Sequence, residues 1–303
     1  MPEWDPEIEL DEAAVRALLH AQFRDLSLEG LTRFASGWDN ALWATSDRVV
    51  FRFPRRAIAR RGVEREMAVL PTLAPLLPLP IPVPEWLGQP SDAFPWPFFG
   101  ARLLAGREIA EVDLDGRRQA FGAALGGFLR ALHADRVVTA LHTQLPRDPL
   151  GRADMLVRVP RTRERLDQLA AAGIWQAPPA VEAILLAAST LAPTGKAVVV
   201  HGDLHVRHVL VDAAALPSAV IDWGDVCVAD PAVDLSLYWS VLDEGARSAF
   251  RGAYGPLSSA SLLRARVLAL FLDAALALYA RDTGNALLLA QTLGNLDRNV
   301  NSG

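Results

Sequence analysis

Several residue types that point to particular classes of protein are scarce in this sequence of 303 residues. Cys227 is the single cysteine, which excludes an intramolecular disulfide and a cysteine-only zinc site, and the lack of a disulfide framework favours a cytoplasmic protein. Lys196 is the single lysine, so chemistry that demands a lysine must use Lys196 or accept arginine. Acidic residues outnumber basic ones, 35 to 30, which argues against a protein that holds nucleic acid through bulk charge.

Long hydrophobic runs are also missing. The most apolar stretch, residues 267–280, contains Asp273 and is shorter than the about 20 apolar residues that a membrane-spanning helix needs. We therefore expect a buried helix there and no membrane contact. The acidic first residues have no basic region followed by an apolar segment, so no export signal is expected. With 51% hydrophobic residues, the chain can bury a sizeable core in two domains or in one bilobal unit.

The order of the expected elements favours a bilobal α+β fold with a small antiparallel N-terminal sheet and a mainly helical C-terminal part. Eight prolines between residues 75 and 97 exclude a helix in that stretch. We expect an N-terminal lobe at 1–100, a hinge at 101–106 and a C-terminal lobe at 107–303. Helical spacing covers 8–26, 60–73, 117–134, 152–172, 179–191, 243–253, 259–281 and 285–298, and strand patterns lie within 31–53 and at 197–200, 209–212 and 219–222.

The densest polar cluster is the segment HGDLHVRH, residues 201–208, which lies between two buried strand patterns. Its histidines and Asp203 allow two interpretations. The first is a metal site of zinc or iron, as in a metallohydrolase. No histidine follows His208 to complete such a site, which counts against it. The second is phosphoryl transfer, which needs one carboxylate at the attacking hydroxyl and another that holds magnesium.

The spacing of two aspartates supports phosphoryl transfer. Protein kinases place an Asn five residues after the catalytic Asp, and an Asp-Phe-Gly motif follows after a strand hairpin. Here His208 stands five residues after Asp203, and Asp222 begins the sequence Asp-Trp-Gly nineteen residues after Asp203. Two such motifs, each at a strand end, are a strong signal together.

The N-terminal half offers the other parts of a nucleotide site. Strand alternation places Val50 and Arg52 on one face, so Val50 would line the base pocket and Arg52 would take the place of a phosphate-binding lysine. Glu66, on the following helix, is the expected partner of Arg52. A glycine-centred turn between two strands would cover the phosphates because glycine carries no Cβ. That turn consists of Ser36, Gly37, Trp38, Asp39 and Asn40.

These motifs together resemble the aminoglycoside phosphotransferase family, which has a protein-kinase-like fold. The resemblance covers about residues 28–240, is similar in pattern to 2″-phosphotransferases and macrolide phosphotransferases, and rests on GWDN, VFRFPRR, EREMAVL, FLRALHA, HGDLH, IDWGD and ADPAVDL. It implies a nucleotide cleft between lobes, with Asp203 as catalytic base and Asp222 as magnesium ligand. It also implies that Asp230 and Asp234 brace the catalytic loop. The chain departs from the family pattern by having Arg52 for lysine and His208 for asparagine.

We therefore expect a monomeric enzyme that uses ATP or GTP with Mg²⁺ to phosphorylate a hydroxyl of a small molecule. His208 would assist Asp222 in holding Mg²⁺. The resemblance implies an aminoglycoside acceptor and a role in antibiotic resistance. A macrolide or a metabolite alcohol is the alternative acceptor, because the stretch after residue 235 is less acidic than a polycationic drug requires. A catalytically silent nucleotide-binding protein is the other alternative, because Arg52 and His208 both depart from the family pattern. Asp273 is either a paired structural acid or part of the acceptor wall. The hinge residues expected at the base are Arg102, Leu103 and Leu104, and those expected at the acceptor are Asp203, Asp225, Tyr238, Trp239, Asp243, Glu244 and Asp273.

Overall fold

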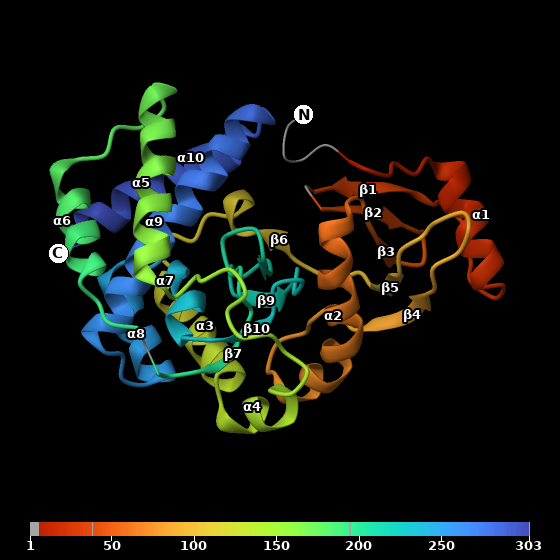
Figure 1. The fold of residues 1–303 in the computed structure, drawn as a ribbon, viewed down its shortest axis with the longest axis horizontal. Helices are drawn as coiled ribbons and strands as arrows, with labels where there is room; N and C mark the ends of the chain where they lie inside the picture. The colour runs from red at the N-terminus through yellow and green to blue at the C-terminus, as the bar shows by residue number, and fades with distance from the viewer. Residues whose placement is uncertain (1–5, 38, 194, 303) are drawn as a thin grey trace. The chain divides into compact units, whose positions relative to one another are not determined.

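The computed structural model describes residues 6–37, 39–193 and 195–302. The described chain divides into two compact units (Figure 1). Unit 1 comprises the residues up to 75 together with 80–104 and 222–225, and unit 2 comprises 76–79, 105–221 and 226 onward. The first boundary after the N-terminal sheet lies at Leu104, inside the segment 101–106 that was expected to act as a hinge; hinge motion itself stays a prediction.

Unit 1 contains an antiparallel sheet and two α-helices. Its elements are α1 (Glu12–Gln22), β1 (Thr32–Ser36), β2 (Asn40–Ala44), β3 (Val49–Pro54), α2 (Ala57–Leu73), β4 (Pro84–Gly88) and β5 (Phe98–Arg102), and the 3-10 turn η1 (Ala74–Leu76) continues from α2. The strands are ordered β1-β2-β3-β5-β4, so β3 lies at the centre of the sheet. Asp11 begins α1 because its carboxylate accepts the N–H of Ala14, at 2.8 Å.

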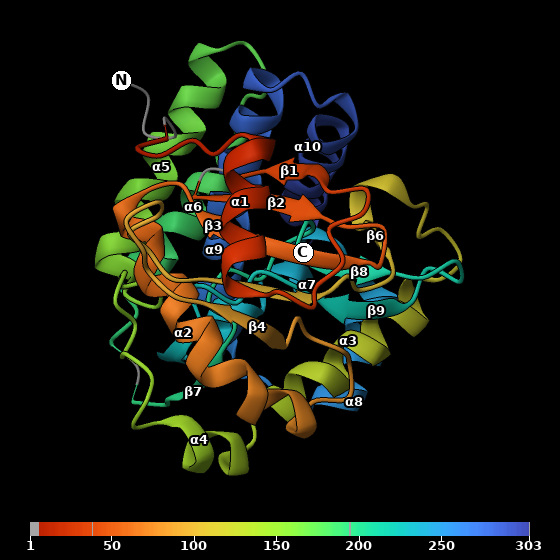
Figure 2. The same ribbon diagram turned by 90° about the vertical axis from the view of Figure 1, so that its right-hand side faces the viewer.

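The two faces of this sheet carry different side chains. Phe51, Phe53 and Phe98 pack in one apolar cluster with the buried residues of α1, which crosses that face (Figure 2). Since successive strand residues point to opposite sides, Arg52 of β3 belongs to the other face. On that face Phe99 of β5 packs with α2. The strand alternation expected from the sequence is therefore present, and it directs Arg52 toward α2.

Unit 2 is mainly helical and also contains two small antiparallel sheets, ordered β10-β7 and β6-β8-β9. Its strands are β6 (Arg107–Glu108), β7 (Val198–Val200), β8 (Val209–Val211), β9 (Pro217–Val220) and β10 (Cys227–Ala229). Its 3-10 turns are η2 (Ile109–Glu111) and η3 (Pro231–Asp234). Its helices are α3 (Arg118–Leu132), α4 (Asp135–Leu141), α5 (Met155–Ala171), α6 (Pro179–Ser189), α7 (Ser236–Ser240), α8 (Glu244–Tyr254), α9 (Ser259–Asp282) and α10 (Ala286–Asn301).

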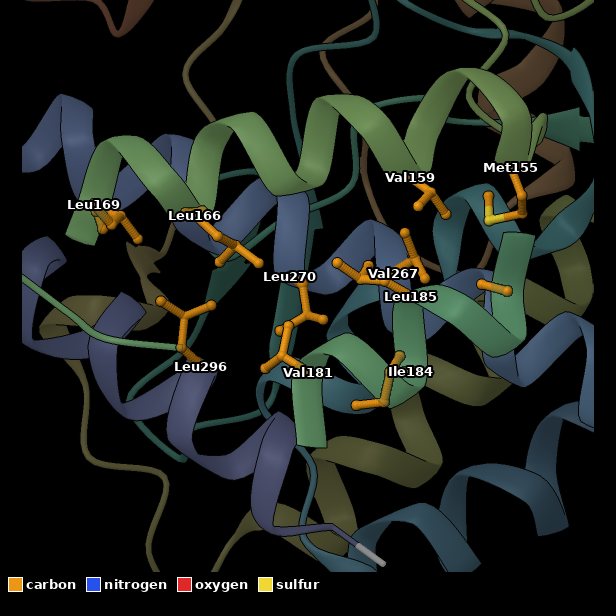
Figure 3. Packing of buried hydrophobic residues seen from close by; sticks show 13 residues of the cluster. Met155, Val159, Leu166, Leu169, Val181, Ile184, Leu185, Val267, Leu270 and Leu296 are labelled. Carbon is orange, nitrogen blue, oxygen red and sulfur yellow. The ribbon is translucent and has the colours of Figure 1, made fainter. Parts of the chain in front are cut away.

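The largest apolar cluster of unit 2 joins four helices. Leu270 of α9 lies among buried side chains of α5, α6 and α10, including Leu166, Val181 and Leu296 (Figure 3). Burying a side chain of this kind contributes about 1.5–3 kcal/mol. The apolar stretch 267–280 therefore forms part of a buried helix, as expected. Among the residues that the structure describes, no helix is both long enough and apolar enough to cross a membrane.

The observed elements confirm the expected mixed fold, with an antiparallel sheet early in the chain and a helical body later. The helices α4 and α7 were not expected separately, because each is too short to show a helical period. The strand patterns at 197–200, 209–212 and 219–222 correspond to β7, β8 and β9. The segment 201–208 thus connects β7 to β8, and Asp222 follows shortly after β9.

Candidate active site

The buried carboxylate of Asp234 holds the segment that follows β7 in place. Asp234 accepts the backbone N–H of His201 at 2.7 Å and of Gly202 at 3.0 Å. His133 Nε2 donates to the same carboxylate at 3.2 Å. Gly202 has a φ of 93°, a conformation that L side chains rarely adopt, so glycine is required between His201 and Asp203. These contacts give Asp234 the bracing position that the resemblance implied.

Two histidines, His201 and His208, hydrogen-bond to the backbone of Asp203, and these bonds define which ring nitrogen carries the proton. His201 accepts the N–H of Asp203 at Nδ1, at 3.3 Å, and donates from Nε2 to the carbonyl of Ile221, at 2.9 Å. His208 donates from Nδ1 to the carbonyl oxygen of Asp203, at 2.7 Å. A backbone carbonyl can only accept, so the Nε2 of a neutral His208 holds a lone pair.

The carboxylate of Asp203 lies close to two imidazole rings. Its Oδ2 is 3.5 Å from His205 Nε2 and 3.8 Å from His208 Nδ1, and 29% of the Asp203 side chain is exposed. Burial raises the pKa of Asp203, but His205, His208 and Arg152 more than offset burial and hold that pKa well below its usual range. Asp203 is therefore an ionised carboxylate that can accept a hydrogen bond from a hydroxyl.

The same three side chains offer ligand atoms that all lie within 4.8 Å of one another, a spacing that a metal ion could use. The hydrogen bonds argue against a zinc or iron centre. His208 uses Nδ1 as a donor, and His205 accepts the N–H of Arg207 at Nδ1, at 3.3 Å, which leaves the proton on the nitrogen that faces Asp203. Both ring nitrogens nearest the carboxylate, His205 Nε2 and His208 Nδ1, thus carry protons rather than lone pairs.

A second group of charged side chains lies in unit 1 and centres on Arg52. Its Nε is 3.3 Å from Glu66 Oε2, and its Nη2 donates to Asp222 Oδ1 at 2.6 Å. Burial lowers the pKa of Arg52, but Asp222 and Glu66 raise it by more, so the guanidinium stays charged. The pair of Arg52 and Glu66 that the sequence predicted is observed. Glu64, the other acid on α2, instead pairs with Arg60 at the surface.

Glu66 also connects α2 to the segment 222–225. It is fully buried, and its Oε1 accepts the backbone N–H of Trp223 at 3.0 Å. Burial raises the pKa of Glu66 to about 7 in spite of Arg52, and the nearby carboxylate of Asp222 adds to the shift. Asp222 itself has a φ of 64°, a strained conformation for a residue other than glycine. Its side chain is 42% exposed.

The predicted phosphate-covering turn joins β1 to β2. The N–H of Gly37 donates to the carbonyl of Asn40 at 2.9 Å, and the carbonyl of Gly37 accepts from Arg55 at 2.8 Å. A Cβ at Gly37 would meet only the Asn40 carbonyl, at 3.8 Å. Burial raises the pKa of Asp39, which lies 3.4 Å from Arg56. Ser36 ends β1, and the predicted residue Trp38 lies outside the described residues.

The residues predicted to bind the base lie on β3, in the case of Val50, and at the end of β5, in the case of Arg102 and the two leucines that follow it. Val50 is opposite Ala101 in the sheet. Arg102 is exposed, pairs with Glu85 at 3.1 Å and lies over the ring of Trp86. Leu103 already uses its N–H, which donates to the carbonyl of Arg48 at 2.8 Å. Leu104 follows at the unit boundary. The backbone of Leu103 therefore offers its carbonyl, not its N–H, to a base.

Several residues of the predicted acceptor wall are buried and have partners within the protein. Asp273 is buried on α9, where Ser240 Oγ donates to it at 2.5 Å and Asn295 Nδ2 at 2.8 Å, so it is the paired structural acid of the two alternatives. Tyr238 is buried and its hydroxyl accepts from Arg251. Trp239 is buried between the guanidinium groups of Arg247 and Arg266, at 4.5 and 4.6 Å.

The remaining acids of that group lie elsewhere. Asp243 caps α8 by accepting the N–H of Ala246 at 2.8 Å. Glu244 is exposed and pairs with Arg251 at 3.3 Å. Asp225 belongs to unit 1 and helps to raise the pKa values of Asp39 and Glu66. The aromatic rings of the stretch 238–241 thus pack against Arg247 and Arg266 and do not form part of a wall of carboxylates.

Asp222 of unit 1 and His208 of unit 2 each offer a donor atom that suits a divalent cation. Asp222 provides a partly exposed carboxylate, and His208 provides the Nε2 lone pair described above. A histidine that donates its other ring nitrogen to a backbone carbonyl is the usual form of a metal-binding histidine. Hard Mg²⁺ prefers oxygen, so the Asp222 carboxylate is the stronger of the two ligands.

Comparison with known proteins decides the family. Residues 30–268 match the model of a family described as the phosphotransferase enzyme family, and this range contains all of Arg52, Glu66, Asp203, His208 and Asp222. The chain belongs to this family. The predicted resemblance and the prediction of a phosphotransferase are thereby confirmed.

Solved structures of phosphotransferases share the fold. A GDP and kanamycin complex of APH(2")-IIIa has a TM-score of 0.70 at 20% identity and covers 95% of this chain and 98% of that one. Macrolide 2'-phosphotransferase type I has a TM-score of 0.63 at 23% identity, with 95% and 98% covered. A streptomycin and ATP complex of APH(2")-IIa has a TM-score of 0.56 at 18% identity and covers 95% of this chain and 99% of that one.

One curated relative matches over a short segment. The uncharacterized protein YcbJ of Bacillus subtilis (strain 168) is 42% identical over 45 residues, which is 15% of each chain. Because so little of that protein's length is matched, it adds nothing on the activity of this phosphotransferase family member.

Two residues of the site were missed by the sequence analysis. His205 was noted in the cluster 201–208 but received no role, although its ring faces Asp203. Arg65 lies within the motif EREMAVL, which assigns it no role, yet its Nη1 donates to the carbonyl of Gly224 at 2.5 Å. The two-residue spacing of Asp203 and His205 was the available signal for the first. Nothing in the local sequence of α2 signals the second.

Proposed function

We propose that this phosphotransferase family member transfers the γ-phosphoryl group of a nucleoside triphosphate to a hydroxyl group of a small molecule. The observation that carries the proposal is Asp203, an ionised and partly exposed carboxylate on a loop that Asp234 holds in place. A carboxylate in this state orients an attacking hydroxyl and accepts its proton. The family match over residues 30–268 supports the same reaction class.

In the proposed reaction the acceptor oxygen forms a bond to the γ-phosphorus. The bond from that phosphorus to the β–γ bridging oxygen breaks, and the nucleoside diphosphate leaves with the electron pair. The hydroxyl proton passes to Asp203. Because the pKa of Asp203 is held low, the carboxylate takes this proton only as bond formation makes the hydroxyl acidic, and its earlier role is to orient the hydroxyl.

Unit 1 supplies the proposed phosphate contacts. Arg52 would hold the inner phosphates, positioned by Glu66, and the turn at 36–40 would cover them. Asp222 and His208 would hold Mg²⁺, which when bound neutralises charge on the phosphate oxygens. The solved structures similar in fold contain GDP in one case and ATP in another, so both donors belong in the test.

The acceptor class divides into three candidates. An aminoglycoside is favoured by the likeness to structures that contain kanamycin or streptomycin. The arginines and aromatic rings around 238–241 favour a macrolide or a metabolite alcohol, because a polycationic acceptor needs carboxylates and Asp273 is fully engaged. For an aminoglycoside, binding would depend on Asp225, Asp243 and Glu244.

The deciding experiment measures nucleotide consumption with ATP and with GTP against a panel of aminoglycosides, macrolides and simple polyols. Products are identified by the mass of an added phosphoryl group, and Asp203→Asn serves as the control. We expect one acceptor class to be phosphorylated by the wild type and not by the variant. A phosphorylated product in equal yield from both proteins would contradict the role of Asp203.

A catalytically silent nucleotide-binding protein is the second candidate. The observation that favours it is the 2.6 Å bond from Arg52 to Asp222, which places a guanidinium on the carboxylate that would hold Mg²⁺. Tight triphosphate binding without turnover across the whole panel would support this candidate over the enzyme.

A further inference from the structure

His205 lies beside Asp203, the proposed base. Among the hydrogen bonds of the described residues, none joins Nε2, the His205 nitrogen that faces Asp203, to another residue. Its Nε2 is 3.5 Å from Asp203 Oδ2, and only 11% of its side chain is exposed. The two residues are close in sequence, on the loop between β7 and β8. The ring is therefore fixed near the carboxylate by the same backbone that carries Asp203.

Two contacts restrict the orientation of the His205 ring. The backbone N–H of Arg207 donates to Nδ1 at 3.3 Å, so a neutral ring carries its proton on Nε2, toward Asp203. The ring also stacks on His208, with centroids 3.8 Å apart and planes 30° apart. His208 is itself fixed by its bond to the Asp203 carbonyl, at 2.7 Å. Rotation of His205 away from Asp203 would have to break this arrangement.

Charged groups from other elements also face Asp203 and His205. Arg152 helps to lower the pKa of Asp203, and Arg158 interacts electrostatically with both Arg152 and Asp203. On the other side, the buried carboxyl of Asp273 on α9 interacts electrostatically with His205. A distance of 3.5 Å is too long for a strong hydrogen bond. Catalytic contacts of this kind commonly tighten when the substrate is bound.

We propose that His205 is a positioning residue whose Nε2–H orients the Asp203 carboxylate, leaving the other carboxylate oxygen to receive the acceptor hydroxyl. The inference rests on the proposed function, because it assigns His205 a part in the same transfer. It involves no proton transfer to His205, since Nε2 already carries a proton. His205 acts only through Asp203 and does not touch the nucleotide.

The first test needs no substrate. The protein contains six histidines, and ¹⁵N labelling of them allows the protonated nitrogen of each ring to be identified by NMR. His205→Gln identifies the signals of His205 by their loss. We expect the proton on Nε2 for His205 and on Nδ1 for His208. A proton on Nδ1 of His205 would overturn the proposal, because that nitrogen could not accept from Arg207.

The second test compares two substitutions. Gln places an amide N–H at about the reach of Nε2, whereas Leu removes the donor. We expect His205→Leu to lower kcat by about 10–100-fold, which is less than the about 10²–10⁴-fold loss typical for a missing base. The KM for nucleotide should stay within about threefold, and His205→Gln should recover most of kcat. Water serves as the acceptor, through slow triphosphate hydrolysis, should the panel give none.

Controls separate this inference from the proposed function. His142 is an exposed histidine of unit 2 at the end of α4, and its Nδ1 hydrogen-bonds to the Val138 carbonyl, so His142→Leu should behave as wild type. Unfolding midpoints identify a variant that loses activity by misfolding. Full activity in Asp203→Asn would remove the proposed function itself. An inactive Asp203→Asn beside a fully active His205→Leu would overturn only the positioning role.

Discussion

Asp203 is the side chain on which the proposed chemistry depends. Asn is nearly the same size and can still accept a hydrogen bond, but it cannot take the proton of the acceptor hydroxyl. We expect Asp203→Asn to lower the rate of transfer by about 10²–10⁴-fold. Nucleotide affinity, measured by calorimetry, should stay within a few fold of wild type because the phosphate contacts are assigned to unit 1. A variant with near-full activity would refute the assignment.

Arg52 is the position at which the chain departs most from the family pattern. We expect Arg52→Ala to weaken triphosphate binding and to slow transfer, because the inner phosphates lose their cation. Nucleoside binding should be spared. The substitution leaves the buried Glu66 without its cation, and breaking such a pair costs about 3–5 kcal/mol. Unfolding curves and nucleoside affinity therefore accompany the measurement of triphosphate affinity.

Arg52→Lys tests whether the site has adapted to a guanidinium. The observed group uses Nε toward Glu66 and Nη2 toward Asp222, 3.3 and 2.6 Å away. A lysine has a single nitrogen and cannot repeat both contacts in the same geometry. We expect Arg52→Lys to behave nearly like Arg52→Ala in triphosphate affinity. Wild-type affinity in both variants would show that Arg52 is only a structural residue of β3.

At the scale of elements, α9 carries a buried acid that links it to its neighbours. Asp273 accepts hydrogen bonds from Ser240 at the end of α7 and from Asn295 of α10. Burial raises the pKa of Asp273 to about 6, although both hydrogen bonds lower it. A carboxyl that is desolvated in this way contributes to the pH dependence of folding.

The sign of that contribution follows from proton binding. Between about pH 4 and pH 6 the folded protein holds a proton on Asp273 that the unfolded chain has already released. The stability contributed by this proton is present below about pH 4 and is lost as the pH rises toward 6. The slope is at most about 1.4 kcal/mol per pH unit from this one group.

We expect Asp273→Asn to remove this slope from the free energy of unfolding, because Asn does not titrate. Urea unfolding at a series of pH values between about 4 and 8, a range that includes this titration, measures the difference from wild type. Asp282→Asn, at the exposed end of the same helix, is the matched control and should keep the wild-type slope. Parallel curves for wild type and Asp273→Asn would contradict the prediction.

At the scale of the whole molecule, a short late segment belongs to the early unit. Residues 222–225 contact unit 1 through Arg52, Glu66 and Arg65, although the residues on either side of them belong to unit 2. Close packing fixes this arrangement further, because a Cβ at Gly62 would lie 3.3 Å from the Cα and the carbonyl oxygen of Gly224.

Asp222 is the side chain of this segment that carries the proposed cation. We expect Asp222→Ala to abolish the magnesium dependence of triphosphate binding, because the stronger oxygen ligand is lost. Calorimetric titrations with and without Mg²⁺ measure the effect. Asp212→Ala, at an exposed turn after β8, is a control for the removal of a carboxylate from the chain. Unchanged affinity for triphosphate in the presence of Mg²⁺ would count against Asp222 as a ligand.

The sequence predicted those parts of the site that local motifs define. Spacing alone brought out Asp203 and Asp222, each following a strand, and strand alternation put Arg52 on the face toward α2. The choice of Glu66 over Glu64 was also correct for the observed ion pair. These features depend on the two-residue period of strands and the period of about 3.6 residues of helices, and both periods can be recognised in the sequence alone.

The sequence could not predict which polar groups form hydrogen bonds within the protein and are therefore not available to a ligand. Asp273 looked available for an acceptor, but its partners Ser240 and Asn295 lie 33 and 22 residues away. The sequence predicted that Leu103 contacts the base, but its N–H donates a hydrogen bond to the Arg48 carbonyl. Only the folded chain brings such distant groups within hydrogen-bond distance.

The amino-acid sequence by itself determined the reaction class, the order of the elements and the pair of aspartates, because these follow from short motifs and local periodicity. The tertiary structure alone decided that residues 222–225 join unit 1, that His205 faces Asp203 and that Arg247 and Arg266 pack on the ring of Trp239. The reason is physical: burial and the choice of hydrogen-bond partner are set by contacts between segments far apart in sequence, and local patterns do not encode them.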